Sequence, residues 1–184
     1  FYYAWRKVEG LDDEAEGIDS MYTLIQGMFD HKRLRDIIRN FVYIPDASKK
    51  DEKIVCRCPQ YYAANKLLEN IKLHQKPHGD GKGGTYFGAT GCGKSFTMLF
   101  LARLLMKGVH FSSPTIVLIT DRTDLDDQLS GTFTNAKGFI GDQNVISVES
   151  RKELRELLQN RKSGGVFLTT IHKFTEDTEL LTER

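Results

Sequence analysis

One eight-residue segment constrains this chain more than any other: residues 88–95 read Gly-Ala-Thr-Gly-Cys-Gly-Lys-Ser. The segment matches the pattern G-x-x-x-x-G-K-[S/T] at every fixed position. It follows an extended stretch, Thr85 to Phe87, and precedes a helical pattern of apolar residues over 98–105. Strand, glycine-rich loop and helix in this order are typical of a phosphate-binding loop. The chain is therefore predicted to bind a nucleotide.

The residue types in this loop suit a triphosphate. Glycines let successive backbone N–H groups point inward without a Cβ in the way, and the N-terminus of the following helix adds partial positive charge. Lys94 is expected to reach the β- and γ-phosphates, and the Ser95 hydroxyl is expected to bind Mg²⁺, which makes these two the candidate catalytic residues. Cys92 stands at an unconstrained position and is expected to pack as a small residue, with an oxidation-sensitive thiol as the alternative. The expected nucleotide-binding residues of the loop are Gly88, Ala89, Thr90, Gly91, Cys92, Gly93, Lys94 and Ser95.

The pattern after residue 85 alternates between strands and helices. Extended runs are predicted at 85–88, 115–120, 144–148 and 165–170, and helices at 93–107, 122–130 and 150–160. Such alternation indicates a parallel sheet covered by helices. The expected fold is an α/β P-loop domain with a doubly wound parallel sheet and helices on both faces. It occupies residues 53–184 and follows a small helical lead-in over residues 1–52.

Composition excludes several other classes. The chain has 184 residues with a net charge of +1 from 26 basic and 25 acidic residues, so global charge does not indicate nucleic-acid or membrane binding. No apolar run approaches the roughly 20 residues that a membrane span needs. The sparse, odd set of Cys56, Cys58 and Cys92 indicates a reducing cytoplasm rather than a disulfide framework. The first residue is Phe1 rather than Met, so we expect an internal piece of a longer polypeptide.

A phosphate loop does not specify what is done with the nucleotide. Catalytic sites of this kind usually have a carboxylate for Mg²⁺ at the end of another strand. The candidate is Asp121, which follows four apolar or small residues. If Asp121 had this role, the chain could be a nucleotide kinase or a GTPase-like switch.

Several further segments, taken in order, resemble the motor subunit of type I restriction enzymes. Motor subunits of this family are superfamily 2 translocases with RecA-like domains. Arg57-x-x-Gln60-x-x-Ala63 resembles the adenine-recognition element of that family, and residues 88–95 match its motif I. The run Ile119 to Gln128 resembles motif Ia, and residues 166–174 resemble the strand and turn before motif II. The resemblance covers most of residues 20–175.

The resemblance implies an ATP-dependent translocase acting on double-stranded DNA, with ATP and Mg²⁺ as cofactors. Its partners would be the methyltransferase and specificity subunits of a restriction complex, and a nuclease domain outside this chain would cut the DNA. Motif II, the second RecA-like domain and the arginine finger of the family have no counterpart in these residues. We therefore expect the 184-residue chain alone to fold and to hydrolyse ATP negligibly.

The resemblance also assigns individual residues. Gln60, with Arg57 beside it, is expected to bind adenine, because an amide both donates and accepts hydrogen bonds; an ordinary solvated helix residue is the alternative. Arg122, Thr169 and Thr170 are the expected DNA contacts, with strand-end residues as the alternative. Other functions left open are another superfamily 2 helicase or repair translocase and a nucleotide-gated interaction module.

Overall fold

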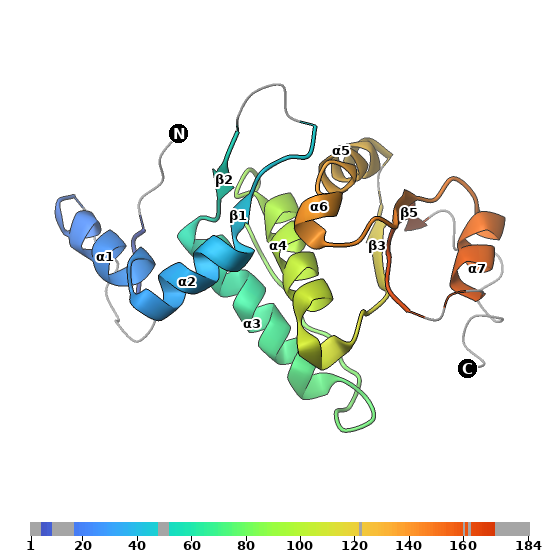
Figure 1. Cartoon of the computed structure of the whole chain (residues 1–184), viewed down its shortest axis with the longest axis horizontal. Coiled ribbons are helices and arrows are strands. Elements are labelled where there is room, and N and C mark those ends of the chain that lie inside the picture. The colour runs from blue at the N-terminus through green and yellow to red at the C-terminus, as the bar shows by residue number, and fades with distance from the viewer. Residues whose placement is uncertain are drawn as a thin grey trace. The chain divides into compact units, whose positions relative to one another are not determined.

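The computed structural model describes residues 5–8, 17–47, 52–121, 123–159, 161 and 163–171, excluding the side chains of 123–126. Figure 1 shows the helices and strands of the chain, which divides into two compact units. Unit 1 comprises Phe1–Ile44 and Ser48–Leu104, and unit 2 comprises Pro45–Ala47 and Leu105–Arg184. The boundary expected near residue 52 between lead-in and motor domain stays a prediction. Across the described ranges, no helix has both the length and the apolar character of a membrane span.

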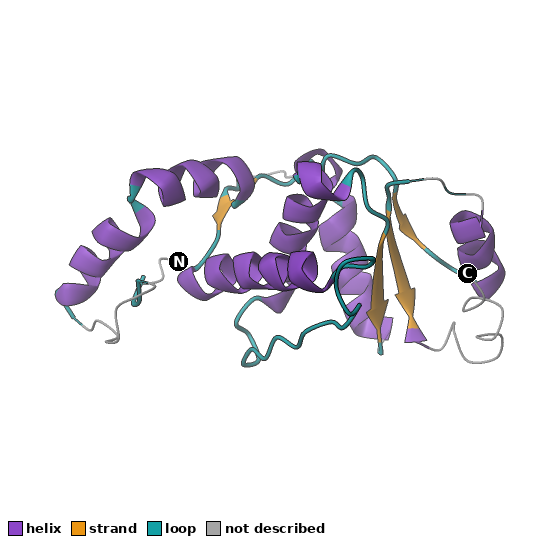
Figure 2. Cartoon of the chain, turned by 90° about the horizontal axis from the view of Figure 1, so that it is seen from below, coloured by secondary structure: helices purple, strands orange, loops and turns teal. Residues whose placement is uncertain are grey.

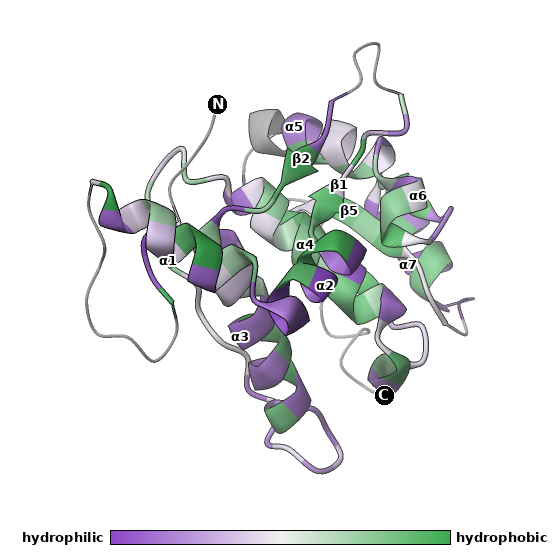
Figure 3. Cartoon of the chain, turned by 60° about the vertical axis from the view of Figure 1, so that its left-hand side comes forward, coloured by the Kyte–Doolittle hydropathy of each residue, from purple (hydrophilic) through white to green (hydrophobic). Residues whose placement is uncertain are grey.

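Unit 1 begins with two short helices, α1 (Asp19–Met28) and α2 (His31–Asn40). Asp30 separates them and caps α2, because its carboxylate accepts a hydrogen bond from the Arg33 backbone N–H at 3.0 Å. This bond holds the pKa of Asp30 below its ordinary value. Hydrophilic and hydrophobic residues alternate around α2 and α3, as Figure 3 shows.

A short antiparallel pair and two longer helices complete unit 1. Strand β1 (Val42–Tyr43) pairs with β2 (Ile54–Val55), and Val42 lies opposite Val55. Helix α3 (Cys58–His74) carries Pro59 in its first turn, where a missing N–H is harmless. Helix α4 (Lys94–Lys107) begins inside the phosphate loop, close to the predicted bounds.

An aromatic cluster forms the core of unit 1. The Phe41 ring, which is fully buried, lies 4.8 Å from the Tyr61 ring of α3 and 5.3 Å from the Phe100 ring of α4. At one end of this cluster, the Tyr43 ring lies 6.3 Å from the Phe96 ring. Rings at these separations gain interaction energy beyond the burial of their area. The cluster therefore fixes α3 against α4, the helix that carries the phosphate loop.

The strand expected at residues 85–88 is absent, so this prediction is wrong. Residues 81–89 have no regular secondary structure, and Phe87 is 91% exposed. A strand forms only where a neighbouring strand pairs its backbone N–H and C=O groups. Gly83 and Gly84 precede the segment, and no strand of unit 1 pairs with it in the described residues.

Unit 2 contains a parallel sheet of strands in the order β3–β5–β4, which Figure 2 shows side by side. The strands are β3 (Ile116–Thr120), β4 (Val145–Ser147) and β5 (Val166–Thr170), near their predicted positions. Every residue of β5 is buried, as expected of the central strand of a covered parallel sheet. The fold is thus α/β with a parallel sheet, as the alternation predicted.

Helices connect and cover these strands. Helix α5 (Thr123–Thr134) packs against all three strands, and α7 (Arg151–Gln159) packs its Leu154 on the sheet face that carries Phe167. Figure 1 shows α5 and α7 on opposite sides of the sheet. Helix α5 extends four residues beyond its predicted end, and two short elements were not predicted from the sequence. These are the 3₁₀ helix η1 (Val109–Phe111) and α6 (Lys137–Ile140).

Replacing Phe41 with Ala is expected to lower the free energy of unfolding by about 3–5 kcal/mol. The physical reason is that Phe41 is 0% exposed and contacts aromatic rings of two helices. Denaturant unfolding of the 184-residue chain measures the change. The control Phe87→Ala removes a ring that is 91% exposed and should change stability by less than about 0.5 kcal/mol. Equal effects of the two variants would contradict the assignment of the core.

Candidate functional site

The phosphate loop, residues 88–95, turns sharply into α4. The Cys92 backbone N–H donates to the Ala89 carbonyl at 3.2 Å and closes the turn. Gly91 and Gly93 have φ values of +78° and +82°, a region that side chains other than glycine rarely enter. These two glycines permit the curl that phosphate-binding loops need.

Lys94 folds back over this loop. Its Nζ donates to the Gly88 carbonyl at 2.9 Å and to the Ala89 carbonyl at 3.1 Å. An ammonium group has three N–H donors, so these two bonds orient it and leave a third for an anion. The half-buried charge lies at the N-terminus of α4, where the helix dipole also favours an anion.

Ser95 follows Lys94 in the first turn of α4 and is half-buried. Within the described residues its hydroxyl makes no hydrogen bond, so the oxygen can serve as a ligand of a hard cation such as Mg²⁺. The described parts of the chain contain no cluster of His, Cys, Asp or Glu side chains suited to a metal. The residues present thus fit Mg²⁺ bound together with phosphate oxygens rather than in a cage made by the protein alone.

Gln60 lies beside the loop although 33 residues separate it from Gly93 in sequence. Its Nε2 donates to the Gly93 carbonyl at 3.1 Å, and its Oε1 accepts from the Arg57 backbone N–H at 2.8 Å. Gln60 is only 3% exposed. The structure therefore brings Gln60 to the phosphate loop and Arg57 to Gln60, while their contact with adenine stays a prediction.

Two further residues support the loop, and sequence reasoning missed both. The Tyr86 hydroxyl lies close to the side chains of Cys92 and Thr97, and Thr97 is 1% exposed. Burial, with the Cys92 thiol beside it, raises the pKa of Tyr86. A Cβ on Gly88 would lie 2.7 Å from the Cys92 Sγ, which explains why that position is glycine. No sequence pattern relates position 86 to position 97, so the proximity of their side chains is evident only in the folded structure.

The residues expected to contact DNA lie in unit 2 and are distant in sequence from the phosphate loop. Thr169 is fully buried and Thr170 is 4% exposed, and both end the central strand β5. Arg122 lies outside the described residues. Asp121 is exposed directly after β3. The DNA contacts thus remain predictions, and burial of the two threonines gives their side chains a packing role in the structure.

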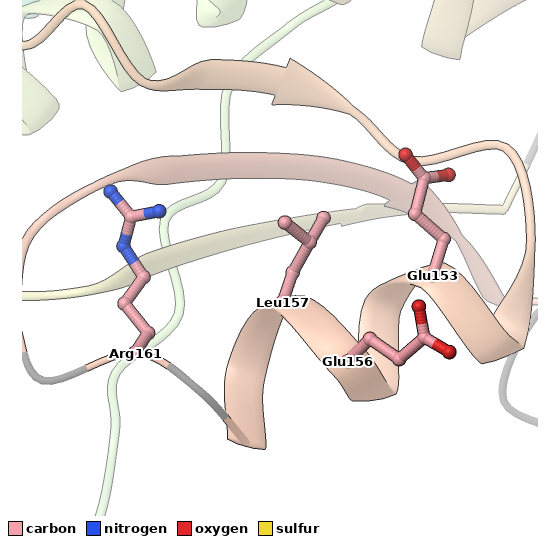
Figure 4. Close-up of a pocket in the computed structure, with 4 residues that line it drawn as sticks. All are labelled: Glu153, Glu156, Leu157 and Arg161. Carbon is pink, nitrogen blue, oxygen red and sulfur yellow. The ribbon is translucent and has the colours of Figure 1, made fainter.

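A surface pocket of unit 2 runs along α7, and Figure 4 shows its lining residues, Glu153, Glu156, Leu157 and Arg161. Glu153 accepts a hydrogen bond from the Glu149 backbone N–H at 2.8 Å, which caps the helix. The Arg161 guanidinium lies over the Phe167 ring at 5.0 Å. Because these charged groups stabilise local structure, the phosphate loop is the stronger candidate site.

Comparison with known proteins points to one family. Residues 59–184 match the model of the SWI2/SNF2 ATPase family. The chain is 38% identical over 162 residues to the type I restriction enzyme HindI endonuclease subunit of Haemophilus influenzae, covering 88% of this chain and 15% of that protein. It is 30% identical over 193 residues to the putative type I restriction enzyme MjaIXP endonuclease subunit of Methanocaldococcus jannaschii, covering 94% and 17%. The chain thus spans less than a fifth of the length of these relatives.

Replacing Gly93 with Ala is expected to cost about 1–3 kcal/mol of stability, because a side chain there is strained. The new Cβ would also lie 2.5 Å from the Gln60 Nε2. Gly91→Ala introduces the same kind of backbone strain, but its Cβ would have no atom within 4 Å. This variant should therefore lose less stability than Gly93→Ala. Gly131→Ala, in open space on helix α5, should stabilise by about 0.4–1 kcal/mol. Denaturant unfolding ranks the three variants, and a different order would contradict this explanation.

The cysteines should react with iodoacetamide at different rates. Burial, together with Asp36 and Cys58 nearby, raises the pKa of Cys56 to about 12, so this thiol stays protonated at pH 8. Cys58 is also buried, whereas Cys92 is half-buried in the loop. Mass spectrometry at pH 8 should find Cys92 alkylated first and the other two only after denaturation. Similar alkylation rates for all three cysteines in the folded chain would contradict this order of reactivity.

Proposed function

The chain belongs to the SWI2/SNF2 ATPase family, and on that basis we propose that it is the ATP-binding part of a type I restriction subunit. Relatives named as endonuclease subunits of type I restriction enzymes support this role. In this proposal, the full-length protein couples ATP hydrolysis to translocation along double-stranded DNA, and a domain outside this chain cleaves the DNA.

One observation carries the proposal: the Lys94 ammonium lies at the loop carbonyls and at the N-terminus of α4. Backbone N–H groups, a helix dipole and an ammonium group at one place form a site for a polyphosphate. Because the charge on a transferred phosphoryl group spreads over its oxygens, such a site favours hydrolysis by positioning and neutralisation. We assign these roles to residues 88–95.

Within this site, the residues have separate tasks. Lys94 binds the β- and γ-phosphates and offsets charge that develops on the γ-phosphate. The Ser95 hydroxyl is the ligand that this chain offers to Mg²⁺, which, when bound, neutralises phosphate charge. Gly91 and Gly93 keep the loop in a conformation that exposes its N–H groups to the phosphates.

The proposed partners are double-stranded DNA and the methyltransferase and specificity subunits of the restriction complex. Arg122 and the strand end at Thr169 and Thr170 are the proposed contacts with DNA. The free cysteines of the described chain agree with a reducing cytoplasm as the location.

A second candidate is a DNA translocase that acts without methyltransferase or specificity subunits. The match of residues 59–184 to the SWI2/SNF2 ATPase model favours it, because the description of that model names an ATPase and no restriction enzyme. The two candidates share the phosphate loop, and what stimulates ATP hydrolysis distinguishes them.

Replacing Lys94 with Ala should lower the ATPase rate of the full-length protein by about 10²–10³-fold or more, because the variant lacks the ammonium at the phosphates. The measurement is ATP turnover with and without duplex DNA and the partner subunits. Stimulation that needs both DNA and partners supports the restriction subunit. Stimulation by DNA alone supports the second candidate.

Lys107→Ala is the matched control, since it removes the same charge from the last turn of the same helix. Its turnover should equal that of the unmodified protein. Undiminished turnover of Lys94→Ala would overturn the site assignment, and turnover indifferent to DNA would favour the kinase or switch classes.

A further inference from the structure

Helix α2 of unit 1 concentrates positive charge. Its ten residues include Lys32, Arg33, Arg35 and Arg39 but a single carboxylate, Asp36. We propose that Lys32, Arg35 and Arg39, here called the basic row, bind the phosphate backbone of duplex DNA. DNA as the partner rests on the proposed function, whereas the surface is a new one, because the contacts proposed above all lie in unit 2.

The three side chains of the basic row lie on one side of α2. Residues three and four positions apart are neighbours on a helix surface, so the spacing 32, 35, 39 forms a continuous row. All three residues are exposed, whereas Ile37, on the other side of the helix, is 1% exposed. At about 1.5 Å of rise per residue, the row extends over about 10 Å along the helix axis.

The only carboxylate of α2 does not neutralise this row. The Asp36 Oδ1 accepts a hydrogen bond from the Asn40 Nδ2 at 2.7 Å. The Tyr61 ring of α3 also lies close to Asp36, and burial together with this carboxylate raises the pKa of Tyr61. Among the residues that the structure describes, no side chain of the basic row makes an ion pair. The row therefore presents three positive charges to solvent.

Helix stability alone does not explain the basic row. The helix dipole favours Arg39 in the last turn, but it disfavours Lys32 in the first turn, which contains no acidic residue. Helix α7 has the charge-balanced alternative, in which glutamates alternate with basic residues and the Lys152 Nζ lies 3.9 Å from the Glu156 Oε1. Because the net charge of the whole chain is only +1, the concentration of positive charge on α2 is local.

A further guanidinium lies beside the C-terminal end of the row. Arg103 of α4 is half-buried, and its Nη2 donates to the Arg39 backbone carbonyl at 2.8 Å. Burial, and to a lesser extent the charge of Arg39, lowers the pKa of Arg103. Two like charges this close repel each other, and an anion bound at Arg39 would reduce that repulsion.

Duplex DNA has the charge pattern that complements this surface. Each strand carries one phosphate per about 3.4 Å of the duplex axis, so a row of about 10 Å faces about three phosphates. Guanidinium groups stay charged and bind phosphate oxygens through two hydrogen bonds at once. Phosphate contacts position a protein on DNA without reading its sequence. A contact of this kind suits a protein that moves along DNA of any sequence.

Replacing the whole row with glutamine tests the proposal, because glutamine removes the charge and is also a good helix former. The substitutions are Lys32→Gln, Arg35→Gln and Arg39→Gln. Fluorescence anisotropy would measure binding of the full-length protein, without nucleotide, to a labelled duplex of arbitrary sequence at several salt concentrations. The slope of log K against log salt concentration should become less steep by about 2–3, since each phosphate contact contributes about 0.9. At about 0.1 M salt, the affinity should be about 10²–10³-fold lower.

The matched control removes the same number of exposed positive charges from α7, by Arg151→Gln, Lys152→Gln and Arg155→Gln. Its salt dependence should equal that of the unmodified protein. A charge-conserving variant, Lys32→Arg with Arg35→Lys and Arg39→Lys, should retain most of the slope, which separates charge from packing. If the triple glutamine variant does not fold, Arg35→Gln alone should still reduce the slope by about 1.

An unchanged slope in the glutamine variant would overturn the inference. An equal reduction in the α7 control would overturn it too, because net charge alone would then explain both results. If the α2 variant binds DNA normally but assembles poorly with the partner subunits, the basic row belongs to a protein interface instead. Absence of any DNA binding by the unmodified protein would overturn both the inference and the proposed function. A slope that depends on α2, together with ATP turnover indifferent to DNA, would overturn the proposed function alone.

Discussion

The Gly93 carbonyl is the acceptor on which the proposed nucleotide site of this chain depends. It takes hydrogen bonds from Gln60 of α3 and from the first backbone N–H groups of α4. Gly93 also has a positive φ that reverses the chain immediately before Lys94. Because one peptide fulfils these roles, the loop, the start of α4 and the start of α3 are placed together rather than independently.

The aromatic core of unit 1 makes this arrangement possible. A hydrogen bond of 3.1 Å between Gln60 and Gly93 requires that α3 and α4 be held within a fraction of an ångström. The contacts of Phe41 with Tyr61 and Phe100 supply that constraint. Since packed aromatic cores deform little, a change at Phe41 would reach the phosphate loop through the two helices.

Unit 2 has the burial pattern expected of a parallel sheet that helices cover. Its central strand β5 is buried along its whole length, and Phe167 packs with Leu154 of α7 and Val148. The same burial removes Thr169 and Thr170 from the surface in the structure, which sequence patterns at strand ends do not reveal. The proposed contact with DNA therefore depends on which groups the end of β5 exposes, and the residue types alone do not show this.

The sequence by itself determined the local features of this protein. The phosphate-loop pattern at 88–95 and the positions of strands β3 to β5 follow from residue types and their spacing along the chain. Only the tertiary structure decided that residues 85–88 form no strand and that both sides of the Gln60 amide bind backbone. The physical reason is that a hydrogen bond forms only where packing delivers a partner. Among the described residues no strand pairs with 85–88, and the Gly93 carbonyl that Gln60 reaches is 33 residues away in sequence.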